Sequence, residues 1–314
     1  MINLAQIREA REMIRSVLHV TPVLSSRYLG SRCGCEVWLK AELLQKTGSF
    51  KPRGAINRLK RLSTEEKARG IVSVSAGNHA QAVAFAASME HVPCVVVMPS
   101  TAPQMKLDAT RGYGAEVVLH DDLRTIFDRT EEVRKQRNAT FVHPFDDADV
   151  IAGQGTTGLE ISEQVPGADI VVAGIGGGAL LGGIAVACKS LNPRVRIIGV
   201  EPEGAAGMTL ALREGKPVRL PHIATIADGL AAPYAGTAPL ELVRSYVDDV
   251  VLVSDDQILD ACRVLLERTK LLVEPAGAAC VAALLSGKIE AAGKKVVLVL
   301  SGGNLDLTRL KSYL

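Results

Sequence analysis

The chain has 314 residues, 47% of them hydrophobic and 22% charged, with a formal net charge of +2. This is the composition of a globular protein with room for one large domain or two smaller ones. The near-neutral, scattered charge argues against nucleic-acid or membrane partners, and six cysteines without the paired spacing of a zinc site indicate a reduced, cytoplasmic protein.

The first 18 residues, MINLAQIREAREMIRSVL, predict an amphipathic helix that mixes acidic and basic residues. They lack the continuous apolar stretch of a signal peptide and the acid-poor composition of a transit peptide. An uncharged run at 170–188 is long enough to cross a bilayer. Its six glycines would make a weak helix, so a strand, a turn and a buried helix are favoured and no membrane segment is expected.

Residues 43–62, LLQKTGSFKPRGAINRLKRL, carry apolar residues at helical spacing. Ser49 is expected to cap this helix, and Pro52 is tolerated only in its first turn. Lys51 then lies at the positive end of the helix dipole, where a cation is disfavoured. Partial burial would lower the pKa of Lys51 further and favour the neutral amine that forms a Schiff base. An exposed first-turn lysine without a function is the alternative.

From residue 71 onward, β-branched runs alternate with helical patterns. The expected strands are 71–75, 92–99, 115–120, 140–145, 169–175, 196–203, 248–254 and 294–303, and the expected helices are 79–90, 103–113, 124–137, 153–165, about 179–190, 255–269 and 275–286. Such alternation predicts an α/β fold of two doubly wound domains with mainly parallel sheets and a ligand in the cleft where strands end. We assign residues 1–66 and 147–314 to a large domain and residues 67–146 to a small mobile substrate domain.

The segment VVAGIGGGALLGGIA (171–185) predicts a strand, a glycine turn and a helix start, which together form a phosphate cradle. Gly174, Gly176 and Ala179 also fit a dinucleotide fingerprint, with Glu201 as a ribose-binding acid, so a nicotinamide-binding protein is one alternative. A bare turn that binds no ligand is another. Lys51 favours pyridoxal phosphate, because such an enzyme needs a reactive lysine.

Six motifs together resemble the fold type II (tryptophan synthase beta-like) pyridoxal phosphate enzymes, in particular the threonine dehydratase and serine racemase branch. They are KTGSFKPRGA (46–55), SAGNHAQ (75–81), GIGGGALLGG (174–183), TIADGL (225–230), EPAGA (274–278) and SGGN (301–304). They follow the family's order over nearly the whole chain. The resemblance implies a homodimer or homotetramer. No regulatory domain is expected, because the chain ends shortly after the last strand.

The resemblance implies roles for individual residues. Lys51 would carry the cofactor and Phe50 would lie beside its ring. Asn78 would bind the ring hydroxyl, Gly229 would line the ring pocket, and Ser301 would meet the pyridine nitrogen. A hydroxyl does not stabilise a protonated pyridine as a carboxylate would, and the weaker electron sink suits β-elimination over transamination.

Two backbone turns are implied as anion sites. The cofactor phosphate would be bound by the N–H groups of Gly176, Gly177, Gly178, Ala179 and Leu180, where Ala179 replaces the fourth glycine that the family usually has. The substrate carboxylate would be bound at the turn of Ser75, Gly77, Asn78 and His79. Taken singly, each of these residues could be an ordinary turn or capping residue.

The position two residues before Asn78 separates two activities. Serine racemases have a serine there as the second acid–base group, whereas Ala76 matches the threonine dehydratases. The expected function is a one-base ammonia-lyase that converts L-threonine to 2-oxobutanoate and ammonia, and L-serine to pyruvate. The alternatives are a serine racemase or a dehydratase of 3-hydroxyaspartate or another 3-hydroxy amino acid.

A cation site is implied only in part. The racemase branch binds a divalent cation through a glutamate, a carbonyl four residues later and an aspartate six residues later. Glu201 and Ala205 match the first two, but Gly207 replaces the aspartate, which weakens a site for a hard cation. A divalent ion, a monovalent ion or water is therefore left open at this position.

Overall fold

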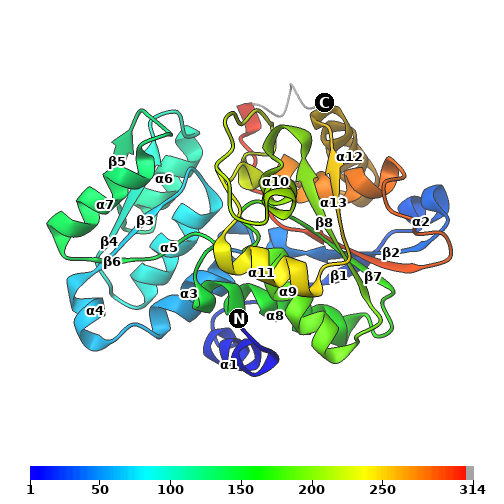
Figure 1. The fold of residues 1–314 in the computed structure, drawn as a ribbon, viewed down its shortest axis with the longest axis horizontal. Coiled ribbons are helices and arrows are strands. Elements are labelled where there is room, and N and C mark those ends of the chain that lie inside the picture. The colour runs from blue at the N-terminus through cyan, green and yellow to red at the C-terminus, as the bar shows by residue number, and fades with distance from the viewer. Residues whose placement is uncertain (309–314) are drawn as a thin grey trace.

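The computed structural model describes residues 1–308 and contains two sheets, each covered by helices (Figure 1). In this part of the chain, the larger sheet has six strands. Their order across the sheet is β1 (Val23–Ser25), β2 (Glu36–Ala41), β10 (Lys295–Leu300), β7 (Ile170–Gly174), β8 (Arg196–Pro202) and β9 (Asp249–Val253). Only β1 is antiparallel to its neighbour, so the sheet is mainly parallel as predicted.

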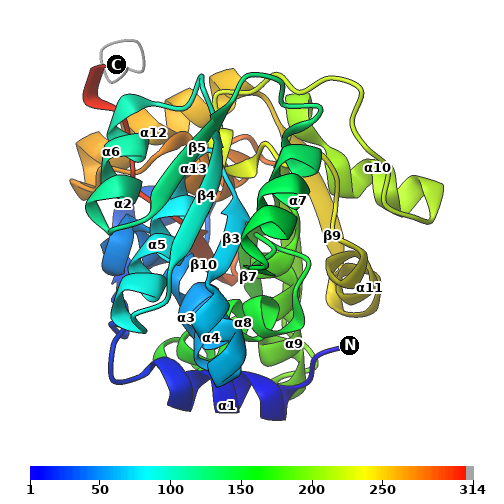
Figure 2. The ribbon, with the colours of Figure 1, turned by 90° about the vertical axis from the view of Figure 1, so that its left-hand side faces the viewer.

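The smaller sheet of the described chain has four strands, all parallel. Their order is β5 (Glu116–His120), β4 (Cys94–Pro99), β3 (Ile71–Val74) and β6 (Thr140–Phe141). Figure 2 looks onto the side of the molecule where this sheet and its helices lie. All strands of the smaller sheet are contiguous in sequence, whereas those of the larger sheet come from both sides of that stretch.

Helices connect the strands and cover both sheets. They are α1 (Leu4–Ile14), α2 (Arg27–Cys33), α3 (Pro52–Lys60), α4 (Thr64–Arg69), α5 (Asn78–Met89), α6 (Gln104–Gly112), α7 (Ile126–Arg137), α8 (Ala148–Gln164), α9 (Ala179–Leu191), α10 (Gly207–Glu214), α11 (Thr237–Tyr246), α12 (Asp255–Thr269) and α13 (Pro275–Leu285). Helix α8 begins five residues before the predicted position 153, because Asp147 caps it through the N–H groups of Asp149 and Val150. No helix of residues 1–308 is long and apolar enough to cross a membrane.

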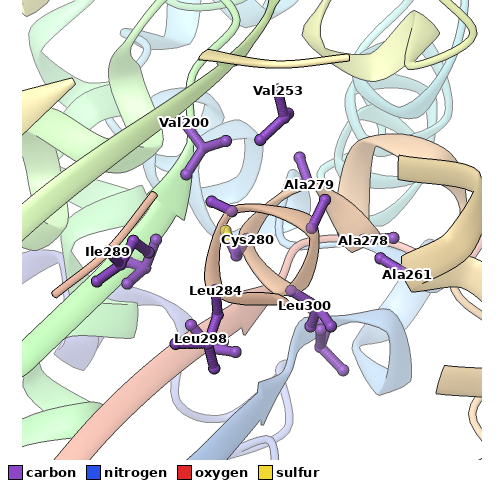
Figure 3. Packing of buried hydrophobic residues seen from close by; sticks show 14 of the residues in the cluster. Val200, Val253, Ala261, Ala278, Ala279, Cys280, Leu284, Ile289, Leu298 and Leu300 are labelled. Carbon is purple, nitrogen blue, oxygen red and sulfur yellow. The ribbon is translucent and has the colours of Figure 1, made fainter. Parts of the chain in front are cut away.

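The larger sheet packs on both faces, as the alternation of its side chains requires. In β10, Val296, Leu298 and Leu300 belong to the apolar cluster that includes α13. Val297 and Val299 point the other way, into the cluster that includes α9. Figure 3 shows Cys280 of the alanine-rich α13 surrounded by strand residues of the first cluster. Burial on both faces explains why these strands are continuously hydrophobic in sequence.

The uncharged run at 170–188 folds as β7, a glycine turn and α9, as predicted. The cysteines of the described chain are all free, and Cys94, Cys188 and Cys280 are buried among apolar side chains. Burial raises the pKa of each of these three thiols to about 12, so they remain protonated.

Candidate active site

A cavity of about 590 Å³ lies between the two sheets. The strand ends Val74, Pro99 and Gly174 line it, so the carboxyl ends of parallel strands from both sheets meet there. All residues that the sequence assigned to the cofactor and the substrate carboxylate also line it: Phe50, Lys51, Ser75, Gly77, Asn78, His79, Gly176, Gly177, Gly178, Ala179, Leu180, Gly229 and Ser301. Glu201 and Ala205 do not line this cavity.

Lys51 occupies the N-cap position of α3, and Pro52 follows at the first helical residue. Its amino group donates to the carbonyl oxygen of Pro144 at 3.1 Å and lies 5.2 Å from the centre of the Phe50 ring. Burial lowers the pKa of Lys51 from 10.5 to about 8. A substantial fraction of this amine is therefore neutral near physiological pH, as a Schiff-base lysine requires.

The prediction that Ser49 caps this helix is wrong. Ser49 is extended and forms an isolated bridge with Gly302, and its hydroxyl has no hydrogen-bond partner in the described chain. The neighbouring N–H of Phe50 donates to the carbonyl of Ser301 at 3.1 Å. Pairing with the end of β10 keeps Ser49 away from the helix start and places Lys51 beside the strand end that carries Ser301.

The glycine turn after β7 leads into α9, which starts at Ala179 without a side-chain cap. The N–H groups of its first turn therefore lack a partner within the helix and are available to an anion. Gly178 has φ +98°, a left-handed conformation that favours glycine. Ala179 is the first helical residue, so its methyl group imposes no unusual torsion where the family usually has a fourth glycine.

Close packing explains a second glycine of this turn. A Cβ on Gly177 would lie 2.0 Å from Cγ of Phe145, whose ring covers the turn. Phe145 follows His143 and Pro144 in a loop, and Nδ1 of His143 accepts from the N–H groups of Phe145 and Asp146. Burial lowers the pKa of His143 to about 4, which keeps this acceptor nitrogen unprotonated at neutral pH.

The turn before α5 forms a second uncapped helix start facing the cavity. Gly77 is the N-cap residue, and its N–H donates to the Ser75 hydroxyl at 3.1 Å. The His79 ring contacts the Ser73 hydroxyl at 3.1 Å and is buried, so it is the backbone at this position that suits an anion. Burial lowers the pKa of His79 well below its usual value, and the ring is neutral.

Sequence reasoning gave no role to three charged residues that also line the cavity: Lys106, Asp228 and Glu274. Lys106 on α6 and Asp228 in the short turn η4 (Asp228–Leu230) form an ion pair of 2.6 Å that joins the two sheets' surroundings. Glu274 accepts a hydrogen bond from the Asn78 side chain at 2.5 Å. The motif EPAGA contains Glu274, but a carboxylate beside a proline has no local pattern that reveals a partner 196 residues away.

Glu201 is buried and caps α10. Its carboxylate accepts from the N–H groups of Met208 and Thr209 at 2.6 and 2.9 Å and from the Thr209 hydroxyl at 2.7 Å. Within residues 1–308, no three His, Cys, Asp or Glu side chains gather in a group that could hold a metal ion. Glu201 faces a helix start here rather than the cavity where a dinucleotide ribose would lie.

Comparisons with known proteins were made for the whole chain. A family model described as "Pyridoxal-phosphate dependent enzyme" matches residues 14–302. The chain is 46% identical over 314 residues to the L-threonine ammonia-lyase of Thermotoga maritima, covering 99% of this chain and 77% of that protein. It is 43% identical over 312 residues to the L-threonine dehydratase catabolic TdcB of Escherichia coli, covering 98% of this chain and 95% of that protein.

Solved structures resemble this one over the same length. Maize serine racemase matches with a TM-score of 0.94 at 38% identity, covering 99% of this chain and 96% of that chain. A threonine deaminase from the organism abbreviated T.th. matches with a TM-score of 0.92 at 40% identity, covering 98% of this chain and 99% of that chain.

Proposed function

The chain belongs to the pyridoxal-phosphate dependent enzymes of fold type II, and on this premise we propose that it is an L-threonine ammonia-lyase. The observation that carries the proposal is the arrangement around Lys51. A partly neutral lysine amine lies in a cavity that also contains two uncapped helix starts. One helix start suits a phosphate and the other suits a substrate carboxylate.

The residues present fit pyridoxal phosphate. The uncapped start of α9 supplies N–H groups for the phosphate, and the cavity of about 590 Å³ is of the size that small-molecule sites have. Lys51 would hold the cofactor covalently, Asn78 would bind the ring hydroxyl, and Ser301 would face the pyridine nitrogen. Bound pyridoxal phosphate supplies an electron sink for the bond that is broken at Cα of the substrate.

The protein's own groups then have separate tasks. The turn of Ser75, Gly77 and Asn78 holds the substrate carboxylate through its N–H groups, which orients the Cα–H bond. Lys51, released as a neutral amine, takes the Cα proton, and the Pro144 carbonyl 3.1 Å away is an acceptor that keeps this amine in place. The β-hydroxyl leaves as water, and the enamine released is hydrolysed in solution to 2-oxobutanoate and ammonia.

Ala76 favours elimination over racemisation. Racemisation needs a second acid–base group on the face opposite Lys51, and an alanine methyl cannot move a proton. Ala76 lines the cavity between the two turn residues Ser75 and Gly77. The high structural similarity to maize serine racemase keeps a racemase as the second candidate, because the two activities share one fold.

The substrate side chain would lie near Phe145 and the segment 231–234. Phe145, Ala231 and Ala232 line the cavity, and Tyr234 packs against Phe145 with ring centres 5.5 Å apart. Small and aromatic groups provide apolar space for the methyl group of threonine and offer no charged partner for a 3-hydroxyaspartate side chain.

Three further expectations stay predictions. We propose that residues 67–146 move as a small domain, although α4 (Thr64–Arg69) crosses the boundary at residue 66. The family resemblance supports a homodimer or homotetramer. A divalent or monovalent cation near Glu201 and Ala205 would have to compete with the three hydrogen bonds that Glu201 already accepts.

The test is 2-oxo acid release from the purified protein offered L-threonine, L-serine and 3-hydroxyaspartate separately, with D-serine scored in the serine reaction. We expect 2-oxobutanoate from L-threonine, a yellow protein that borohydride labels at Lys51, and no activity in Lys51→Ala. Substantial D-serine would instead support the racemase. A protein that stays colourless with added pyridoxal phosphate would refute both.

A further inference from the structure

Glu274 is a buried carboxylic acid at the wall of the cofactor cavity. It precedes α13 as its N-cap residue, but its side chain makes no capping hydrogen bond. Only 1% of the residue is exposed. Oε1 accepts from Nδ2 of Asn78 at 2.5 Å, whereas Oε2 has no hydrogen-bond partner among the described residues. A carboxylate oxygen without a partner is costly to bury, so its position at a ligand cavity calls for a function.

A chain of hydrogen bonds fixes the Asn78 side chain from two sides. Nδ2 of Asn304 donates both to the carbonyl of Thr47 at 2.7 Å and to Oδ1 of Asn78 at 2.9 Å. Asn304 thereby uses both of its amide hydrogens, and Oδ1 of Asn78 must act as the acceptor. Glu274 holds one of the two hydrogens on Nδ2 of Asn78. One N–H of Asn78 remains for a ligand in the cavity.

Reversing the Asn78 amide would be unfavourable. Its oxygen would then face Oε1 of Glu274, and its nitrogen would face the Asn304 amide nitrogen. Both contacts would pair like groups: acceptor with acceptor and donor with donor. Glu274 and Asn304 together therefore decide that Asn78 presents a donor to the cavity.

Charged groups from other elements surround Glu274. Lys106 from α6 and Asp228 from η4 act on it with opposite signs, and the Cys262 thiol of α12 is close enough to be affected by its charge. Burial raises the pKa of Glu274 to about 7, with Asp228 adding to the rise and Lys106 and the Asn78 hydrogen bond opposing it. Glu274 thus exchanges a proton near neutral pH.

We propose that Glu274 is a positioning residue for the ammonia-lyase reaction: it orients Asn78 as a hydrogen-bond donor toward the cofactor's ring hydroxyl, and its free oxygen Oε2 carries a proton that the bound cofactor senses. The inference rests on the proposed function, because it needs pyridoxal phosphate in the cavity. In the deprotonated form, Glu274 holds Asn78 most firmly. Protonation weakens Oε1 as an acceptor and places a new O–H donor at the cavity wall.

The test is a pH titration of the visible absorbance of the yellow holoenzyme. In the wild type we expect a spectral step with a midpoint near pH 7. Glu274→Gln should abolish this step, because glutamine is similar in shape and does not titrate. Lys106→Met should move the midpoint up in pH, since a positive charge is lost, and Asp228→Asn should move it down. Glu203→Gln, which removes a carboxylate at the surface, is the matched control and should leave the step in place.

Orientation is tested separately from titration through cofactor affinity. Glu274→Gln retains a carbonyl oxygen that can accept from Asn78, so its affinity for pyridoxal phosphate should stay close to that of the wild type. Glu274→Met and Asn304→Ala each remove one end of the chain and should weaken affinity by about tenfold, the usual worth of one hydrogen bond. Asn304→Ala should keep the spectral step that Glu274→Met loses.

The outcomes separate the two proposals. A protein that never turns yellow contradicts the proposed function itself. A yellow, active protein whose spectral step persists in Glu274→Gln overturns the role of Glu274 alone. Equal affinity in Glu274→Met and wild type would overturn its positioning of Asn78.

Discussion

At the scale of single residues, the chemistry depends on how the fold treats two ionisable groups. Lys51 and Glu274 both line the same cavity, and burial drives their pKa values to about 8 and about 7, respectively. Burial disfavours the charged form of each group, so it lowers the pKa of the lysine and raises that of the glutamate. The helix start contributes the position of Lys51, whereas the lowered pKa comes from removal from water.

The rate at which the apoprotein takes up pyridoxal phosphate should depend on the neutral fraction of Lys51. Below pH 8 we expect this rate to fall about tenfold per pH unit, and above it to level off, because one proton blocks the amine. The measurement is the growth of yellow absorbance after mixing. Nα-acetyl-lysine is the matched control, and its rate should keep rising until about pH 10.4. A protein profile that follows the free amine would contradict the lowered pKa.

At the scale of elements, the unit that matters is β7, its glycine turn and α9. The turn is covered by the Phe145 ring, which belongs to the loop that also accepts the Lys51 hydrogen bond through Pro144. Asp146 of the same loop accepts from the N–H groups of Thr237 and Ala238 at the start of α11. One short loop therefore connects the phosphate turn, the cofactor lysine and a helix start.

Replacing Gly177 by alanine should damage this turn. Its Cβ would overlap the Phe145 ring, so we expect a loss of about 1–3 kcal/mol in the free energy of unfolding and weaker binding of pyridoxal phosphate. Urea unfolding and cofactor titration measure the two effects. Adding Phe145→Ala should restore part of the cofactor affinity, because the ring that causes the clash is gone.

Gly112 provides the control for this substitution. It ends α6 in helical conformation, and a Cβ there would meet nothing within 4 Å. Gly112→Ala should leave cofactor binding unchanged and alter stability by less than about 1 kcal/mol. Equal effects of the two alanine substitutions would mean that the Phe145 contact is not what makes Gly177 necessary.

At the scale of the whole molecule, a buried ionic cluster joins segments that lie far apart in sequence. Arg53 of α3 pairs with Glu42 and Glu160, and Lys40 of β2 pairs with Glu160 at 2.5 Å. All four residues are buried. Burial acts to raise the pKa of Glu42, but Arg53, with help from Lys40 and Thr21, outweighs it and holds the pKa below its usual value. The cluster anchors the helix that begins beside Lys51.

Arg53→Met should be strongly destabilising, because it leaves two buried carboxylates with too little positive charge. We expect a loss of about 3–5 kcal/mol in the free energy of unfolding, measured by urea unfolding of the apoprotein. Arg134→Met is the matched control. Its guanidinium pairs with Glu131 at the surface, so the expected loss is below about 1 kcal/mol. Similar losses for both variants would show that the buried cluster does not hold the fold together.

Much of the fold could be predicted because its strands are short, β-branched and separated by regular helical patterns. The strands that escaped prediction are β1 and β2. In β2 the charged residue Lys40 interrupts the apolar pattern, and only the distant Glu160 makes its burial possible. The same reason hid Glu274, whose partner Asn78 comes from another sheet's helix.

The sequence by itself determined the alternation of strands and helices, the glycine turn before α9 and the identity of Lys51, because these depend on spacing between near neighbours. Tertiary structure decided which charges meet. It brought Lys106, Asp228 and Glu274 to the cavity, turned Ser49 away from the helix that it was expected to cap, and lowered the pKa of Lys51. Burial and long-range pairing are properties of the packed chain, and no local pattern contains them.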